Sequence, residues 1–292
     1  MSVIENALKR LQGQRPAATE AVAVEDNKAY GTVAHAGAAR RREANGVEAP
    51  ATGRIIKIDQ DALRAAGLLP PAHQEHELAQ QYRRIKRPLI NAALGRGVAP
   101  LPQGNLLMMT SAVPGEGKTF MSLNLAFSMR LEEDITVLLV DGDVVNPRIS
   151  QILGADKEPG LLDLVKDPSR STESVILPTD VPGLAFLPAG RQDANATELL
   201  ASSRMYEVVS KLGSEDPARI VLFDSAPLLV TTESQALAQF VGQILLVVRA
   251  DQTPQRVVFD ALQTLAEGKS VSLVLNQNLH RLHSGYYEQY GA

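Results

Sequence analysis

The chain contains no cysteine, which excludes disulfides, thiolate zinc sites and cysteine nucleophiles. It also lacks an apolar run of about 18 residues, the length that crosses a bilayer, and its first residues lack the apolar core of a secretory signal. A net charge of −4 gives no basic excess of the kind that nucleic-acid-binding proteins show. These absences predict a cytoplasmic protein with no nucleic-acid partner, and they leave open a peripheral location at the inner face of the plasma membrane through a partner.

What is present divides the 292 residues into four predicted parts. Residues 1–12 are predicted to form a short amphipathic helix. Residues 13–72 are predicted to be a largely disordered linker, because Ala, Gly, Pro and charged residues dominate them; a small structured piece is expected over 54–72. Residues 73–283 are predicted to be the folded domain, and 284–292 a mobile tyrosine-rich tail.

Short apolar runs alternate with amphipathic stretches from residue 105 onward. The runs are Leu106–Thr110, Val137–Val140, Leu184–Leu187, Ile220–Phe223, Ile244–Val248 and Ser272–Leu275, and helices are predicted over 118–131, 197–211 and 254–267. This alternation is typical of an α/β fold with a doubly wound, mostly parallel sheet covered by helices on both faces. A further helix is predicted over 73–95, and Pro88 is expected to break or kink it.

A phosphate-binding loop is the strongest motif. Ala112–Thr119 reads AVPGEGKT and lies between a predicted strand and a predicted helix, which is the context that such a loop needs. Glycines let successive N–H groups face phosphate oxygens, while Lys118 reaches the β- and γ-phosphates and Thr119 helps to hold Mg²⁺. Ala112 replaces the usual first glycine. The motif predicts an ATP site with Mg²⁺, contacted by Pro114, Gly115, Glu116, Gly117, Lys118, Thr119 and Phe120.

Two predicted strands end in carboxylates. Val137–Asp143 ends in Asp141 and Asp143, and Val221–Pro227 carries Asp224 at its strand end. Ligands bind beyond the carboxyl ends of parallel strands, so all three aspartates are expected to face the nucleotide. We predict that Thr119, Asp141 and Asp224 hold the metal, and that Asp143 or Asp141 accepts a proton from an attacking hydroxyl. The alternative is that Asp141 and Asp143 only cap the following loop.

Three of the six tyrosines lie in the last seven residues, at Tyr286, Tyr287 and Tyr290. A polar, glycine-flanked terminus offers no core for large aromatic rings. A mobile tail suits a substrate that must enter an active site. The alternative is a tail that packs its rings on its own domain.

Together these features resemble the bacterial tyrosine kinases of capsule and exopolysaccharide systems, and within them the cytoplasmic autokinases associated with exosortase loci. The resemblance covers roughly residues 77–292, and the first residues also look like the start of that subgroup. The phosphate loop, Val137–Asp143, Val221–Pro227 and the tyrosine cluster match the family's motifs in order. The family's Glu-x-x-Arg-x-x-Arg ring-contact helix aligns with Gln81, Arg84 and Arg87, with glutamine in place of glutamate. Arg148 is the first arginine after Asp143, and it lies farther along the chain than the arginine that family members often have after this motif.

The resemblance implies an ATP-dependent protein-tyrosine kinase that phosphorylates Tyr286, Tyr287 and Tyr290 of a neighbouring copy, with Lys118, Asp141 and Asp143 as catalytic residues. It also implies a homo-oligomer, such as a ring, that phosphorylation loosens. A membrane-embedded polysaccharide co-polymerase is the expected activator, a tyrosine phosphatase is an expected partner, and exopolysaccharide biosynthesis is the expected process.

Two other functions fit the same motifs. A partition or septum-positioning ATPase belongs to the same branch of phosphate-loop proteins, but its signature lysine is replaced here by Val113. A non-catalytic scaffold that controls polysaccharide assembly by changing its oligomeric state with the bound nucleotide is the second alternative, which the sequence does not exclude.

Overall fold

The computed structural model describes residues 54–278. Its strands are β1 (Leu106–Ser111), β2 (Thr136–Asp141), β3 (Leu177–Pro178), β4 (Leu184–Leu187), β5 (Arg219–Asp224), β6 (Gln243–Arg249) and β7 (Ser270–Asn276). Its α-helices are α2 (Gln60–Ala65), α3 (Glu75–Leu94), α4 (Lys118–Met129), α5 (Arg148–Ile152), α6 (Leu161–Lys166), α7 (Ala196–Leu200), α8 (Ser203–Ser214), α9 (Thr232–Ala238) and α10 (Gln255–Gln263). Two short 3₁₀ helices are η1 (Ala72–Gln74) and η2 (Thr172–Ser174).

Within residues 54–278, the strands form one seven-stranded sheet in the order β3-β4-β2-β5-β1-β6-β7. All neighbouring strands are parallel except β3 and β4. The predicted doubly wound, mostly parallel sheet is therefore confirmed. Each of the six predicted apolar runs lies within an observed strand.

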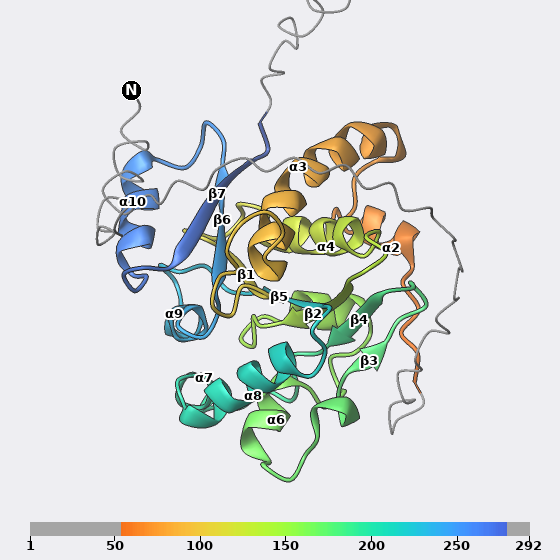
Figure 1. Ribbon diagram of the computed structural model, residues 1–292, viewed down its shortest axis with the longest axis vertical. Helices are drawn as coiled ribbons and strands as arrows, with labels where there is room; N and C mark the ends of the chain where they lie inside the picture. The colour runs from red at the N-terminus through yellow and green to blue at the C-terminus, as the bar shows by residue number, and fades with distance from the viewer. Residues whose placement is uncertain (1–53, 279–292) are drawn as a thin grey trace, which may run out of the picture. The chain divides into compact units, whose positions relative to one another are not determined.

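Side chains that alternate along the strands build a separate apolar core on each face of the sheet. Leu107 and Met109 of β1 pack with α2, α3 and α4, whereas Leu106 and Met108 pack with the core that includes α6, α8 and α10. Figure 1 shows α3 and α4 on one side of the sheet, with α6 and α8 on the other. Burial of each large apolar side chain contributes about 1.5–3 kcal/mol, so both faces stabilise the sheet that carries the strand ends.

Residues 54–72 pack onto this same core. Ile56 forms a parallel bridge with Thr179, and Leu63 and Leu68 are buried against the α4 side of the sheet. The part of the predicted linker from 54 to 72 is therefore folded, while the predicted segments 1–12, 13–53 and 284–292 lie outside the described residues. The domain boundary at residue 283 stays a prediction.

Two predicted helices differ from the observed ones. Helix α3 continues through Pro88 to Leu94, so the predicted break at the proline is wrong. Pro88 has no N–H to donate to the carbonyl of Arg84, yet the helix is retained because Leu89 and Ile90 are buried in the core. The single helix predicted over 197–211 is divided into α7 and α8, because the Ser202 hydroxyl accepts a hydrogen bond from Met205 N and starts a new helix.

A buried lysine joins α3 to the end of α4. Lys86 is 4% exposed, and its ammonium donates to the Ser128 carbonyl at 2.7 Å and pairs with Glu132 at 2.7 Å. The Ser128 carbonyl belongs to the last turn of α4, where backbone carbonyls have no partner within the helix. Lys86 therefore caps α4 from a neighbouring helix and opposes the partial negative charge at its end.

We predict that Lys86→Met destabilises the protein by about 1–2 kcal/mol, because the Ser128 carbonyl loses its donor. For a domain of this size the unfolding temperature should fall by roughly 2–4 °C per kcal/mol, which differential scanning fluorimetry measures. Arg83→Met on the same helix is the matched control, since Arg83 is exposed. Equal unfolding temperatures for the two variants would contradict the capping role.

Candidate nucleotide and metal site

The phosphate loop lies directly between β1 and α4, as predicted. Gly115 and Gly117 adopt positive φ angles of 84° and 92°, a region that favours glycine. Gly117 is the N-cap of α4, and Lys118 and Thr119 form its first turn. Ala112 is fully buried and has no positive φ, so this position needs no glycine. The loop thus presents backbone N–H groups and a helix N-terminus, which together suit an anion.

The Glu116 side chain has a role that the sequence did not reveal. It is 1% exposed, and its carboxylate accepts hydrogen bonds from Val113 N at 2.9 Å and Arg249 N at 3.2 Å, and from the Thr253 hydroxyl. Glu116 therefore ties the loop to itself and to the end of β6. It was predicted only as a nucleotide contact, and no spacing in the sequence indicates its three donors.

The predicted aspartates meet at the carboxyl edge of the sheet. Asp141 and Asp224 are paired residues on the adjacent strands β2 and β5. Asp143 follows Asp141, and its Oδ2 lies 3.6 Å from Lys118 Nζ. Each carboxylate acts electrostatically on at least one other, and Lys118 acts on both Asp143 and Asp224. The structure therefore brings together the residues predicted from three separate motifs.

Hydrogen bonds fix all three of these carboxylates, and Asp143 Oδ1 accepts from the amide of Asn146 at 3.1 Å. Asp224 accepts from the Ser122 hydroxyl at 2.8 Å and from the Thr119 hydroxyl. Asp141 Oδ2 accepts from the amide and the hydroxyl of Ser150, both at 2.8 Å. Ser122 could have been identified from the sequence, because it lies three residues after Thr119 on the same face of a helix. Ser150 could not, because only the fold brings α5 back to β2.

One carboxylate oxygen without a hydrogen-bond partner indicates which ligand the site can accept. Asp141 Oδ1 is buried and has no hydrogen-bond partner, which is costly unless a ligand supplies one. Among residues 54–278, no three acidic or histidine side chains are arranged to hold a metal ion by themselves. Carboxylates with one hydroxyl suit Mg²⁺, which binds through one or two protein carboxylates and completes its shell with phosphate and water. The residues present therefore fit Mg²⁺ that arrives with a nucleotide.

Burial raises the pKa values of all three carboxyl groups. Burial, and then the neighbouring Asp224, raises the pKa of Asp141 to about 7. Burial raises the pKa of Asp224 to about 6, against the opposing effects of Lys118 and two hydroxyls. Burial also raises the pKa of Asp143, although Lys118 opposes it. At neutral pH, partial protonation of Asp141 therefore relieves some of the negative charge in the ligand-free site, and Lys118 opposes the charge that remains on the neighbouring carboxylates.

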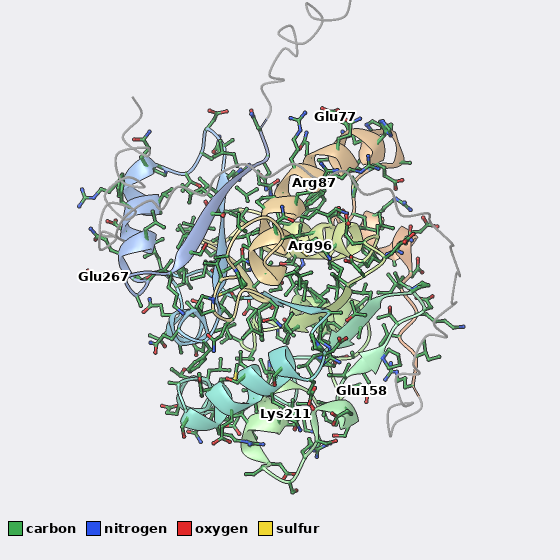
Figure 2. The ribbon with its side chains drawn as sticks, in the orientation of Figure 1. Glu77, Arg87, Arg96, Glu158, Lys211 and Glu267 are labelled. Atoms are coloured by element: carbon green, nitrogen blue, oxygen red, sulfur yellow. The ribbon has the colours of Figure 1, made fainter. Side chains whose placement is uncertain are left out.

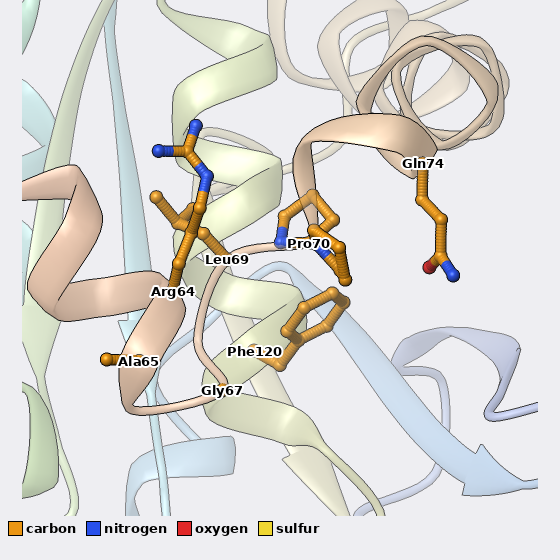
Figure 3. A pocket seen from close by; sticks show the side chains of 8 residues that line it. Arg64, Ala65, Gly67, Leu69, Pro70, Gln74 and Phe120 are labelled. Atoms are coloured by element: carbon orange, nitrogen blue, oxygen red, sulfur yellow. The ribbon is translucent and has the colours of Figure 1, made fainter.

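The remaining predicted residues lie away from this cluster. Phe120 faces an open hollow of about 520 Å³, which the segment 64–71 and Gln74 also line, rather than the aspartates (Figure 3). Gln81, Arg84 and Arg87 are exposed on α3, where Figure 2 labels Arg87. Arg148 is exposed at the start of α5. Tyr286, Tyr287 and Tyr290 lie outside the described residues.

The fold and the site together define a phosphate-loop nucleotide-binding protein of the α/β class. No family model matches the chain. EpsB of Ralstonia nicotianae is named as a tyrosine-protein kinase. It is 34% identical to this chain over 192 residues, a match that covers 64% of this chain and 25% of EpsB. CapB of Staphylococcus aureus is also named as a tyrosine-protein kinase. It is 30% identical over 187 residues, a match that covers 63% of this chain and 80% of CapB.

Solved structures agree with these relatives. The kinase domain of VpsO is 28% identical with a TM-score of 0.58, and the match covers 71% of this chain and 100% of that domain. The BceF tyrosine kinase domain has the same fold, with a TM-score of 0.59 at 24% identity over 74% of this chain and 86% of that domain. The chain belongs to the bacterial tyrosine kinase family. It matches about a quarter of the length of EpsB.

The raised pKa values predict how stability depends on pH. Between about pH 4 and 7 the folded protein keeps protons on Asp141 and Asp224 that the unfolded chain has released. Stability without metal should therefore fall as pH rises through that window. We expect Asp141→Asn to be about 1–2 kcal/mol more stable than wild type at pH 8, because it removes a buried charge.

Thermal unfolding in EDTA at pH 8 and pH 5 checks this prediction. At pH 5 the advantage of the variant should shrink, since wild-type Asp141 is then already protonated. If the variant is less stable by the same amount at both pH values, its hydrogen bonds to Ser150 outweigh the charge and the account of the site's electrostatics is wrong.

Proposed function

We propose that the protein is an ATP-dependent tyrosine autokinase that transfers the γ-phosphoryl group to Tyr286, Tyr287 and Tyr290 of a second copy. The observation that carries the proposal is the junction of Lys118 with Asp141, Asp143 and Asp224 behind a glycine-rich phosphate loop. Membership of the tyrosine kinase family supports the choice of a tyrosine hydroxyl as the acceptor. The three-tyrosine terminus supports the choice of the chain's own tail.

Each residue of the site has a defined task in this proposal. The N–H groups of 115–119 and the ammonium of Lys118 bind the phosphates, and that ammonium stabilises the negative charge that develops during transfer. Thr119, Asp141 and Asp224 would hold Mg²⁺. Bound Mg²⁺ would neutralise phosphate charge.

The proton acceptor must be reachable by a tyrosine hydroxyl, whose ordinary pKa of about 10 makes it a poor nucleophile at neutral pH. The side chain of Asp143 is 10% exposed, whereas Asp141 is fully buried. We therefore assign Asp143 as the base and Asp141 as a carboxylate that faces the metal. Burial raises the pKa of Asp143, which makes it a better proton acceptor than an ordinary aspartate.

Transfer between copies predicts a complementation experiment. Lys118→Met keeps the tail but loses the phosphate contact, and Tyr286→Phe/Tyr287→Phe/Tyr290→Phe keeps the site but loses the acceptors. We expect neither variant alone to take up label from [γ-³²P]ATP, and a mixture to label the Lys118→Met chain on its tail. Peptide mapping of the two chains, which differ in mass through an affinity tag, identifies the labelled copy.

Three results would contradict parts of the proposal. Label on wild-type residues other than the tail tyrosines would contradict the acceptor. Label on the wild-type tail but not in the mixture would mean transfer within one chain. Retention of transfer in Asp143→Asn, with ADP affinity unchanged, would contradict the assignment of the base.

We further propose that α3 contacts a neighbouring copy and that the protein assembles into a homo-oligomer such as a ring. Gln81, Arg84 and Arg87 are exposed on one helix, whose opposite side packs on α4 through Tyr82 and Lys86. The glutamine cannot form the ion pair that a glutamate would, so the two arginines carry the contact.

We expect Arg84→Ala/Arg87→Ala to reduce the mass of the protein in solution toward that of a monomer, as measured by light scattering at matched concentration. Arg83→Ala, also on α3 and exposed, is the control. A wild-type oligomer that the double variant preserves would exclude this face of α3 as the contact.

The proposed setting is exopolysaccharide synthesis and export at the inner face of the plasma membrane. In residues 54–278, no helix combines the length and the apolar character that crossing a membrane requires. A membrane-embedded polysaccharide co-polymerase is the proposed activator, and a tyrosine phosphatase is the proposed opposing enzyme. Addition of the activator's cytoplasmic segment in the complementation assay tests the first of these partners.

A further inference from the structure

The end of β7 contacts the back of the phosphate loop. Asn276 Nδ2 donates a hydrogen bond to the carbonyl of Glu116 at 2.9 Å, and Gln277 Nε2 donates to the carbonyl of Gly115 at 3.3 Å. Both acceptors are backbone groups of the glycine-rich turn. The predicted strand at 272–275 stopped one residue before Asn276, and no motif marked these two amides.

The Asn276 contact depends on a glycine. A Cβ atom at Gly117 would lie 2.1 Å from Asn276 Nδ2, closer than any side chain tolerates. Gly117 therefore serves two purposes, because it adopts a positive φ of 92° and also leaves room for the amide. Such a close fit between a strand end and the loop indicates a specific support rather than a surface contact.

The support continues into β6. Ala250 N donates to the carbonyl of Asn276 at 2.9 Å, and Arg249 N donates to the Glu116 carboxylate at 3.2 Å. The backbone and the side chain of Glu116 are thus both held by the ends of neighbouring strands. Gln277 has a positive φ of 56°, which non-glycine residues adopt rarely, so the backbone is held in an uncommon conformation next to the loop.

Peptide planarity connects this support to phosphate binding. The C=O and N–H of one peptide point in opposite directions, so a carbonyl of Glu116 that is held toward β7 sends the N–H of Gly117 the other way. Anion-binding turns work by presenting successive N–H groups on one side. We propose that Asn276, assisted by Gln277, is a positioning residue of the nucleotide site that sets the orientation of the 115–117 peptides toward the phosphates.

Asn276→Asp tests the proposal, because it keeps the shape of the side chain and replaces the donor with a carboxylate. At pH 7.5 we expect affinity for Mg·ADP, measured by isothermal titration calorimetry, to fall by about tenfold. Asn276→Ala should lose about fivefold, since it removes the donor without adding a charge.

Gln277→Glu is a graded comparison, because Gln277 only assists Asn276. Its amide makes the longer bond and is exposed, so its loss should change affinity less than that of Asn276. Unfolding temperatures within a few degrees of wild type show that the variants are folded; if Asn276→Asp is not, Asn276→Ala carries the test. Mg·ADP affinity within twofold of wild type in folded Asn276→Ala overturns the proposal.

Mg·ADP affinity of folded Asn276→Asp within twofold of wild type would also overturn it, because the carboxylate cannot donate to the Glu116 carbonyl. ADP binding needs no phosphoryl transfer. Failure of this inference is therefore distinguishable from failure of the proposed kinase activity, which ATP labelling of the tail measures.

Discussion

Unbalanced negative charge at the carboxyl edge of the sheet is the constraint on which the rest of the structure depends. Three aspartates face one ammonium there, and the most buried of them has an oxygen without a partner. Water does not reach Asp141 to relieve this cost. The sheet, with an apolar core on each face, supplies the stability that holds these like charges together until a cation and phosphates arrive.

The phosphate loop is held by the elements around it rather than by its own sequence alone. Glu116 binds the end of β6, Asn276 binds the carbonyl of Glu116, and the Ala112 carbonyl accepts from Leu229 N after β5. These contacts come from strands on both sides of β1. A loop supported in this way is preorganised for an anion, since little reorganisation is needed when phosphate binds.

The parts predictable from the sequence are those with a local pattern. Apolar alternation located six of the seven strands in residues 54–278, and missed the two-residue β3. Spacing after β1, β2 and β5 located Lys118, Asp141, Asp143 and Asp224, because parallel strand ends share one edge. Asn276 was not predictable, since it meets the phosphate loop, which is distant in sequence, only in the fold. Ser150 was not predictable either, since no motif places the start of α5 against Asp141, nine residues earlier. The predicted break at Pro88 was wrong because burial of one face of the helix outweighed one lost hydrogen bond. The single helix predicted over 197–211 was wrong because the Ser202 cap divides it although its apolar pattern continues.

The dependence of ATP affinity on Mg²⁺ tests the central claim most directly. At pH 8 the account predicts that Mg²⁺ strengthens ATP binding by wild type well beyond tenfold, since the carboxylates repel phosphates that carry no metal. Asp224→Asn should lose most of this enhancement, and it should bind metal-free ATP at least as well as wild type does. Equal affinity with and without Mg²⁺, unchanged in Asp224→Asn, would contradict the account.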